Sequence, residues 1–289
     1  MRRRFLLVHN PVAGLKGDTL VDAVVCELLR RGASVAREAG AAPALSAEGY
    51  DAVIAAGGDG TIRGLHAALA AGRVPLGIIP AGTGNVFATE LGLQRNAAVI
   101  ADVLIGGPVV EIEGARANGR PFFLMAGAGF DGEVVSKLDT DLKRRFGKLA
   151  YAAPLVRALL KKPVDLAVTI DGERHQARWV VAANARHYGG SFVIAPRAGL
   201  LMPGLEAVLF KGKSRRTSVC QLLSLAAGRL ESEPGVEILS CRRIEVEAAV
   251  PVPVEIDGDP FEPTPLAVEA GGPRLAMIVP PEFLSGRAS

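Results

Sequence analysis

The chain has 289 residues, of which 49% are hydrophobic and 22% charged, with a formal net charge of +3. This composition excludes a disordered or low-complexity protein, and so small a net charge gives no reason to expect a nucleic-acid partner. Three widely spaced cysteines without a CxxC pair indicate neither a disulfide framework nor a structural zinc site, and they favour the reducing cytoplasm. The apolar run at the start stops at Val8, too early for a signal peptide, and no apolar run reaches the roughly 18 residues of a membrane-spanning helix.

The first hundred residues alternate short apolar runs with helical patterns, which predicts βα units around a mostly parallel sheet. Strands are expected at 5–8, 52–56 and 76–79, and helices at 19–31 and 62–71. The first, second and third of these strands are followed by the turns HNPVAG, GGDGT and GTGN, and in such sheets ligands bind beyond the carboxyl ends of the strands. A glycine-rich turn can be purely structural, but three polar turns at successive strand ends predict a phosphate-binding site.

After about residue 107 the sequence changes to alternating apolar and polar residues broken by Gly, Asn and Asp, which is typical of half-buried antiparallel strands. One helical pattern interrupts them at 143–161, and a final apolar strand is expected at 274–283. The fold class that follows is an α/β domain with a mostly parallel sheet, followed by an antiparallel β domain.

The motifs NPVAG, GGDGT and GTGNVFA resemble, in this order, the diacylglycerol kinase catalytic family, which also includes sphingosine and ceramide kinases and bacterial lipid kinases. The segments AGAGFDGEVV, FGKLAY, ANARHYGGSFVIAPRA and EIDGDPF extend the resemblance over nearly the whole chain. It implies a nucleotide-binding α/β domain over 1–107, completed by 273–289, and a β-sandwich over 108–272 that binds the lipid substrate. The active site is then expected in the cleft between the two domains.

The resemblance also implies a kinase that uses ATP and Mg²⁺ to phosphorylate a lipid hydroxyl, on diacylglycerol or a related lipid of phospholipid biosynthesis. ATP would be held by residues of the three turns: Asn10, Pro11, Gly14, Gly57, Gly58, Asp59, Gly60, Thr61, Gly82, Thr83 and Asn85. Asp59 would also face Mg²⁺, and Asp257 is a second candidate metal ligand. Asp259 stands where bacterial relatives carry a general-base glutamate in a DGE motif, and Asp131 is expected near the lipid hydroxyl or the cleft.

These residue types suit phosphoryl transfer, because that reaction needs amides and Mg²⁺ around the phosphates and a carboxylate to orient or deprotonate the attacking hydroxyl. Each carboxylate has an alternative role. Asp259 lies in a DGD sequence that also predicts a hairpin turn, and its side chain is one methylene shorter than the family's glutamate. Asp59 is then the alternative base, as in the sphingosine-kinase branch, and Asp131 is alternatively a helix N-cap.

The sequence departs from the family pattern at several positions. Val86 stands where many relatives have an aspartate, and Met202 and Pro203 replace acidic residues of a second, structural metal segment in which only Glu206 remains acidic. We therefore expect the second metal site to be absent or rebuilt. The GAGFDG sequence at 127–132 matches a dinucleotide-binding pattern, but no repeating βαβ pattern follows it, which argues against that function.

Two basic segments predict contact with anionic membranes. Residues 137–162 contain eight Lys or Arg against two Asp, and residues 211–229 contain five Lys or Arg and no acid. Either segment can be an ordinary solvated helix face, but a basic surface also favours peripheral, salt-sensitive membrane binding. Two competing functions are an NAD kinase-like enzyme, which shares GGDGT, and a non-catalytic regulatory protein that binds nucleotide or lipid. We expect a cytoplasmic, peripherally membrane-associated protein without a nucleic-acid partner, and the sequence leaves a homodimer open.

Overall fold

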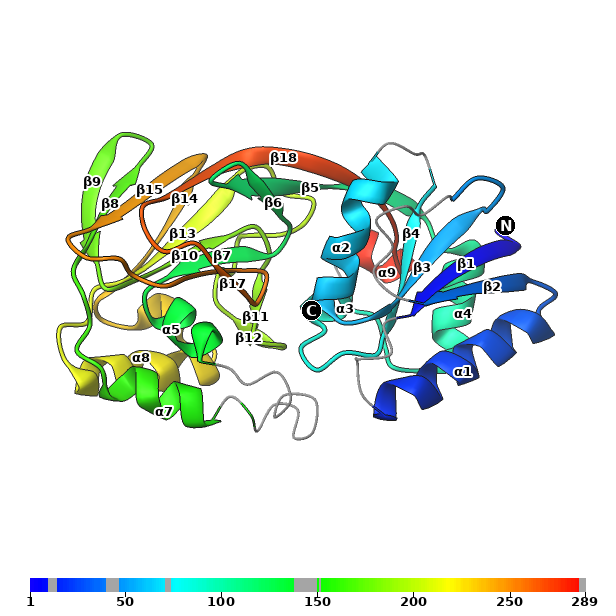
Figure 1. Cartoon of the computed structure of the whole chain (residues 1–289), viewed down its shortest axis with the longest axis horizontal. Helices are drawn as coiled ribbons and strands as arrows, with labels where there is room; N and C mark the ends of the chain where they lie inside the picture. The colour runs from blue at the N-terminus through cyan, green and yellow to red at the C-terminus, as the bar shows by residue number, and fades with distance from the viewer. Residues whose placement is uncertain (10–14, 40–46, 71–73, 138–149, 151, 286–289) are drawn as a thin grey trace. The chain divides into compact units, whose positions relative to one another are not determined.

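The computed structural model describes residues 1–9, 15–39, 47–70, 74–137, 150 and 152–285. These residues form two compact units, unit 1 with residues 1–112 and the residues from 274 onward, and unit 2 with residues 113–273 (Figure 1). The boundaries expected from the sequence, at 107 and 272, lie slightly before the structural ones. Each unit has a hydrophobic core of its own.

Unit 1 is built on a parallel sheet. The strand order is β2 (Ser34–Ala39), β1 (Arg4–His9), β3 (Ala52–Gly57), β4 (Leu76–Pro80) and the end of β18 (Leu266–Ile278). The helices of this unit are α1 (Leu15–Arg30), α2 (Asp59–Ala70), α3 (Val86–Glu90), α4 (Ala97–Gly106) and α9 (Pro281–Leu284). Strands β3 and β4 are buried along their whole length, as is typical of a parallel sheet with both faces covered. The predicted parallel arrangement is confirmed.

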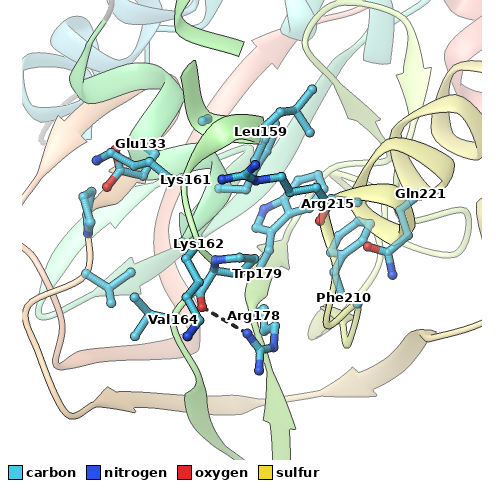
Figure 2. Close-up of a pocket in the computed structure, with 18 of the residues that line it drawn as sticks. Glu133, Leu159, Lys161, Lys162, Val164, Arg178, Trp179, Phe210, Arg215 and Gln221 are labelled. Carbon is cyan, nitrogen blue, oxygen red and sulfur yellow. Dashed lines mark hydrogen bonds and ion pairs between the residues drawn. The ribbon is translucent and has the colours of Figure 1, made fainter. Parts of the chain in front are cut away.

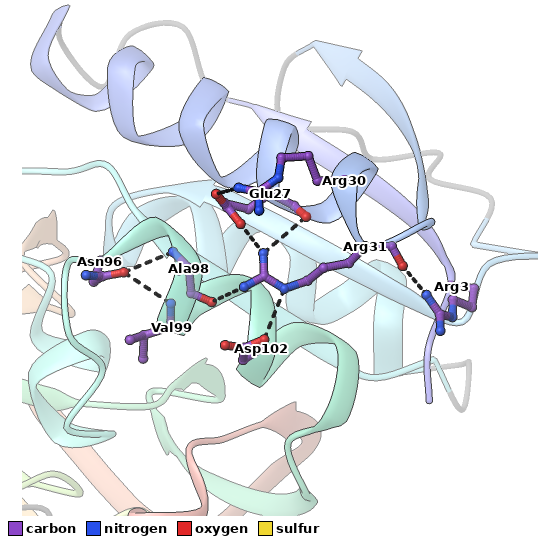
Figure 3. A network of polar contacts seen from close by, with 8 residues as sticks. All are labelled: Arg3, Glu27, Arg30, Arg31, Asn96, Ala98, Val99 and Asp102. Atoms are coloured by element: carbon purple, nitrogen blue, oxygen red, sulfur yellow. Dashed lines mark hydrogen bonds and ion pairs between the residues drawn. The ribbon is translucent and has the colours of Figure 1, made fainter.

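Helices α1 and α4 pack against each other beside this sheet, and Arg31 joins them at the surface. The Arg31 guanidinium donates to Asp102 Oδ1 at 3.1 Å and to the Ala98 carbonyl at 3.4 Å, both on α4, and it also pairs with Glu27 of α1 (Figure 3). The Asn96 side chain caps α4 by accepting hydrogen bonds from two backbone amides. These contacts fix the start of α4 against the end of α1.

Unit 2 is a sandwich of two antiparallel sheets. One sheet contains β9 (Glu173–Ala177), β8 (Leu166–Ile170), β15 (Arg243–Ala248) and the first part of β18, together with β5 (Val109–Ala117) and β6 (Arg120–Phe122). The other has the order β14 (Val236–Cys241), β13 (Leu205–Phe210), β10 (Trp179–Ala183), β7 (Met125–Ala128), β16 (Val254–Ile256) and β17 (Asp259–Phe261). A short separate pair is formed by β11 (His187–Tyr188) and β12 (Phe192–Val193). Apolar side chains of both large sheets share one core, so the predicted fold class is confirmed.

Three helices, α5 (Phe130–Ser136), α7 (Ala152–Leu160) and α8 (Arg215–Ala226), cover the outer face of the second sheet, and α8 leads to a short 3-10 helix, Leu230–Ser232 (Figure 1). Because side chains alternate along a strand, the burial of Val180 and Ala182 in the sandwich core turns Trp179 of β10 toward these helices. The helix expected at 143–161 ends at Leu160, and its first part lies outside the described residues.

Candidate functional site

The GGDGT and GTGN turns lie next to each other at one end of the parallel sheet. Strands β3 and β4 end in register, with Gly57 opposite Pro80, and the Ala81 amide donates to the Gly57 carbonyl at 3.0 Å. The two turns therefore start side by side, as expected for strand ends that share one ligand site. The predicted residues of the first turn lie outside the described residues: Asn10, Pro11 and Gly14.

These two turns pack backbone against backbone. A Cβ atom on Gly82 would lie 2.4 Å from the Cα atom of Gly58, so only glycine fits there. Asn85 closes its turn, because its side chain accepts from the Gly82 amide at 2.9 Å and donates to the Gly82 carbonyl at 2.7 Å. Its φ of 52° is a left-handed conformation that asparagine adopts more readily than most residues. The buried side chain of Thr61 packs against Gly57, so the GGDGT and GTGN turns are in close contact within themselves and with each other.

Asp59 holds the second turn in place. Its Oδ2 accepts a hydrogen bond from the Val86 amide at 3.1 Å, and its Oδ1 accepts one from the Phe87 amide at 3.0 Å. These amides open α3 and have no partner within that helix, and a carboxylate also interacts favourably with the positive end of a helix. The Asp59 carboxylate, which the sequence predicts to face the phosphates or Mg²⁺, therefore binds the first amides of helix α3. Gly60 is exposed and Thr83 is half-buried, so parts of both turns remain at the surface.

In unit 2, two carboxylic groups are buried side by side. Asp131 of α5 and Glu255 of β16 are each 2% exposed. Asp131 Oδ2 and Glu255 Oε1 lie 2.6 and 3.0 Å from the point that a Cβ atom on Gly127 would occupy. Neither oxygen has a hydrogen-bond partner among the described residues. Because Gly127 has no Cβ atom, both oxygens can approach the space beside it.

The second oxygen of each group is hydrogen-bonded. The Tyr188 hydroxyl donates to Asp131 Oδ1, and the Gly258 amide donates to Glu255 Oε2 at 2.7 Å. The Trp179 ring stacks on Phe210 with ring centroids 3.7 Å apart, and its buried indole N–H has no partner of hydrogen-bond geometry in the described part of the chain. The carboxylic pair is thus nearly closed off from the surface and held by the Tyr188 hydroxyl and a backbone amide.

Burial raises the pKa of both groups. Desolvation raises the pKa of Asp131 from 3.8 to about 6, against the opposing effects of the Tyr188 hydroxyl and the nearby Trp179 indole. Desolvation and then the charge of Asp131 raise the pKa of Glu255 well above its ordinary value. Two negative charges so close in a buried site are strongly unfavourable. The pair therefore resists carrying two negative charges at once, and the two groups titrate as a coupled pair.

The DGD sequence forms the turn of the β16–β17 hairpin. Asp257 and Gly258 have φ values of 49° and 81°, the positive values that a tight hairpin turn requires, so the predicted hairpin is confirmed. The buried Asp257 carboxylate accepts hydrogen bonds from three successive backbone amides, at 3.0, 2.9 and 3.1 Å, of residues 123–125. Asp257, a candidate metal ligand in the sequence, is thus an anchor for the hairpin. Asp259, the candidate base, is exposed at the start of β17.

The GAGFDG sequence crosses from β7 into α5. Gly129 holds the N-cap position of α5 and Asp131 lies inside the first turn, so the alternative that Asp131 is an N-cap is wrong. Strand β7 pairs in antiparallel fashion with β10 and β16, which is incompatible with a dinucleotide-binding βαβ unit. The helix instead carries Asp131 to the buried pair.

A cavity of about 110 Å³ opens on the helix-covered side of this sheet (Figure 2). Its walls are mostly apolar and aromatic, and they include Phe130, Leu159, Val164, Trp179, Phe210 and Leu222. Four cationic residues also line it: Lys161, Lys162, Arg178 and Arg215. Trp179 is buried, and it also forms a wall of this cavity.

Two segments of the chain each match a model of a known protein family. A model described as "Diacylglycerol kinase catalytic domain" matches residues 4–117, and one described as "YegS C-terminal NAD kinase beta sandwich-like domain" matches residues 125–280. A diacylglycerol kinase of Mycobacterium tuberculosis is 30% identical over 245 residues, which cover 81% of this chain and 78% of that protein. The chain belongs to the diacylglycerol kinase family. A YegS-like lipid kinase of Pseudomonas aeruginosa is 30% identical over the same shares of the two chains.

Two further proteins are similar to this diacylglycerol kinase family member, one by its solved structure and one by its sequence. A crystal structure of a diacylglycerol kinase from Bacillus anthracis superposes with a TM-score of 0.75 at 24% identity, over 97% of this chain and 98% of that chain. An uncharacterized Synechocystis protein is 30% identical over 81% of this chain, but the match spans 56% of its own length. At the level of the family the chain is a kinase, and relatives named as lipid kinases are among its matches.

The segment in which Met202 and Pro203 replace the acidic residues of other diacylglycerol kinases contains an ion pair between Glu206 and Arg197. The Glu206 side chain is 3% exposed, and its Oε1 pairs with Arg197 Nε at 2.9 Å. Its Oε2 accepts from the backbone amides of Arg197 and Ala198 at 3.0 and 3.2 Å. Within the described ranges, no group of three His, Cys, Asp or Glu is arranged to hold a metal ion. The same ranges contain no helix long and apolar enough to span a membrane.

Sequence reasoning did not single out Glu255 or Tyr188, although both lie in motifs that carry the family resemblance. A signal for Glu255 exists in the sequence, because it is an acid between two apolar strand residues, Val254 and Ile256. Side chains alternate along a strand, so Glu255 had to leave the sandwich core and point to the opposite face. That this face is itself buried, beneath α5, only the three-dimensional structure shows.

Proposed function

We propose that this protein is an ATP-dependent kinase that phosphorylates the hydroxyl group of a diacylglycerol or of a related membrane lipid. The observation that carries the proposal is the apolar cavity of unit 2 with its cationic residues, found in a chain of the diacylglycerol kinase family (Figure 2). Apolar and aromatic walls suit acyl chains, whereas a soluble dinucleotide presents no comparable apolar surface. The cavity therefore favours a lipid kinase over an NAD kinase-like enzyme.

We infer that the nucleotide binds at the two glycine-rich turns of unit 1. Gly58 and Gly82 let the main chain come close to a phosphate, and backbone amides at strand ends and helix starts favour anions. Asp59 supports this arrangement by holding α3. The oxygens of the two candidate metal ligands, Asp59 and Asp257, accept backbone hydrogen bonds, and each ionised carboxylate retains further lone pairs for a cation. The metal of a kinase of this kind is bound largely by the nucleotide phosphates, where it would neutralise charge.

In this proposal Asp259 is the general base. Its carboxylate accepts the proton of the lipid hydroxyl as the hydroxyl oxygen bonds to the γ-phosphorus of ATP, and the bond from that phosphorus to ADP breaks. The supporting observation is that Asp259 is an exposed carboxylate on a firmly held hairpin. Asp257 fixes the turn of that hairpin to residues 123–125, and Glu255 binds the Gly258 amide.

The first experiment measures transfer of phosphate from Mg·ATP to diacylglycerol in mixed micelles. We expect Asp259→Asn to lower the rate by about 100-fold or more, because the base is lost. Asp259→Glu, which restores the family's side-chain length, should retain activity. Glu262→Gln changes an exposed carboxylate near the same hairpin and serves as the matched control, with an unchanged rate. Product from NAD but not from any lipid would instead support the NAD kinase-like function.

A second experiment tests the cavity without catalysis. Trp179 is the one tryptophan of the chain and lines the cavity, so its fluorescence reports on what enters. We expect a diacylglycerol with brominated acyl chains to quench Trp179, and an unbrominated diacylglycerol to leave its emission unquenched. Quenching and ATP binding without turnover of any lipid would support the non-catalytic alternative. Turnover without quenching would show that the acyl chains bind elsewhere.

A further inference from the structure

Helices α7 and α8 expose large apolar side chains. On α7, Val156 and Leu160 are 54% and 59% exposed, and on α8, Val219 and Leu223 are 40% and 64% exposed. Each pair is four residues apart and so forms a row on one face of its helix. The two helices are in contact, and the Arg215 guanidinium donates to the Leu160 carbonyl at 2.6 Å. Two exposed apolar rows therefore belong to one pair of neighbouring helices.

Positive charge accompanies these rows. Residues 152–164 and 211–229 contain no Asp or Glu. Arg157 of α7 and Arg216 of α8 are exposed, and neither forms an ion pair within the part of the chain that the structure describes. The longer basic segment of the sequence analysis, 137–162, lies mostly outside the described residues, so the described charge comes from its last part. Unpaired cations beside exposed apolar side chains are typical of surfaces that bind anionic membranes.

The same helices line the cavity of unit 2. Leu159 and Lys161, which flank the exposed Leu160, line the cavity (Figure 2). Ser218 and Leu222, which precede Val219 and Leu223, line it as well. One side of each helix is therefore turned to the cavity while neighbouring residues are exposed to solvent. The exposed apolar rows and part of the cavity lining therefore belong to the same two helices.

We propose that α7 and α8 form a membrane-docking surface for an anionic phospholipid bilayer. Val156, Leu160, Val219 and Leu223 enter the interface between headgroups and acyl chains, and Arg157 and Arg216 bind the anionic headgroups. This surface deepens the proposed function, because it brings the cavity to the lipid substrate. Its own test is a binding measurement that requires no phosphate transfer, so it can fail or succeed independently of catalysis.

The test compares binding of the full chain to vesicles of equal parts phosphatidylcholine and phosphatidylglycerol, and to vesicles of phosphatidylcholine alone, by cosedimentation. Leu160→Glu and Leu223→Glu should each weaken binding to the mixed vesicles about tenfold, as expected for removing a partly inserted leucine. The matched control is Leu29→Glu on α1, a leucine that is 52% exposed, which should bind like the unaltered protein. Thermal unfolding of each variant confirms that folding is retained.

Charge is tested separately. Arg157→Gln and Arg216→Gln should each weaken binding to the mixed vesicles about fivefold at low salt, whereas Arg174→Gln, an exposed arginine on β9, should not. Equal binding to both kinds of vesicle, or equal loss in the Leu29 control, would overturn the proposal. Absence of vesicle binding together with a dimer that Leu160→Glu and Leu223→Glu dissociate would also overturn it, since the surface would then bind a second copy of the chain.

Discussion

In the turns of unit 1, both oxygens of Asp59 accept backbone hydrogen bonds, whereas in unit 2 Asp131 and Glu255 each bury an oxygen with no partner among the described residues. Asp59 is only half-buried and stabilises the start of a neighbouring helix. The unit 2 pair is nearly inaccessible to solvent and carries raised pKa values because of it.

This difference separates two uses of a carboxylate within one protein. A fully hydrogen-bonded carboxylate contributes to stability, while a buried unsatisfied oxygen costs free energy and is rare in folded proteins. Groups of the second kind concentrate at functional sites, where the fold tolerates their cost. The comparison predicts that substitutions will disturb unit 1 through loss of backbone structure and unit 2 through changes in ionisation.

The largest effect is expected from Gly82→Ala in unit 1. The added Cβ would lie 2.4 Å from Gly58 Cα and 2.8 Å from its amide nitrogen, and backbone atoms cannot rotate away. The two turns must then separate, which we expect to lower ATP affinity by more than about 100-fold and the free energy of unfolding by about 3 kcal/mol. Titration calorimetry with a non-hydrolysable ATP analogue measures the affinity.

The matched control for this prediction is Gly64→Ala. Gly64 lies on α2 after the GGDGT turn, and a Cβ there would meet no atom within 4 Å. Affinity and stability should change little, since only the packed glycine is required by sterics. Similar losses in both variants would show that the close approach of the two turns is not the cause.

The next effect is the pH dependence of unit 2. The pKa of Asp131 is about 6 in the folded chain and 3.8 when unperturbed, so the folded state binds a proton more tightly than the unfolded state. The resulting stability is fully present below about pH 4 and is lost as the pH rises through about 6, with a loss on the order of 3 kcal/mol. Glu255 acts in the same direction, because its pKa is also raised. Urea unfolding between pH 4 and pH 8 measures this loss.

Glu255→Gln sharpens the pH prediction. Glutamine keeps an oxygen to accept from the Gly258 amide and supplies an N–H toward Asp131, but it removes one of the two titrating groups. Three charged groups remain around position 255: Asp131 of α5, and Asp257 and Asp259 of the hairpin. Asp131 is then the group of the pair that still titrates. We expect the loss of stability toward high pH to be smaller in the variant. Parallel pH profiles of the two proteins would mean that other groups cause the dependence.

Replacing an aspartate by asparagine should change the free energy of unfolding differently in the two units. Asp59→Asn replaces one acceptor by an amide group that must face a backbone N–H, so we expect a loss of about 1 to 2 kcal/mol in the free energy of unfolding. Asp131→Asn removes a buried negative charge, and at pH 8 we expect it to be neutral or stabilising. Losses of the same size at both positions would contradict the division of roles.

The sequence predicted the fold well because its strongest signals are local. Buried apolar strands, glycine-rich turns and the DG hairpin each follow from periodicity or backbone conformation, and the structure agrees with them. The partners of the acidic residues are contacts between distant segments, such as Asp59 with α3 and Asp131 with Tyr188, and no local pattern specifies them. The sequence therefore identifies the motifs, but which of their residues face a neighbouring helix and which face each other had to come from the structure.

The smallest effect is expected from Tyr188→Phe. The hydroxyl of Tyr188 donates to Asp131 Oδ1 and favours the ionised form, so its removal should raise the pKa of Asp131 above about 6. At pH 8, where Asp131 is ionised, we expect the variant to lose about 1 kcal/mol of stability, whereas at pH 5, where Asp131 is protonated, the loss should be smaller. Carbon-13 NMR of the Asp131 carboxyl group follows the titration directly. An unchanged titration with an equal loss at both pH values would mean that Tyr188 acts through packing against Trp179 and not through its hydroxyl.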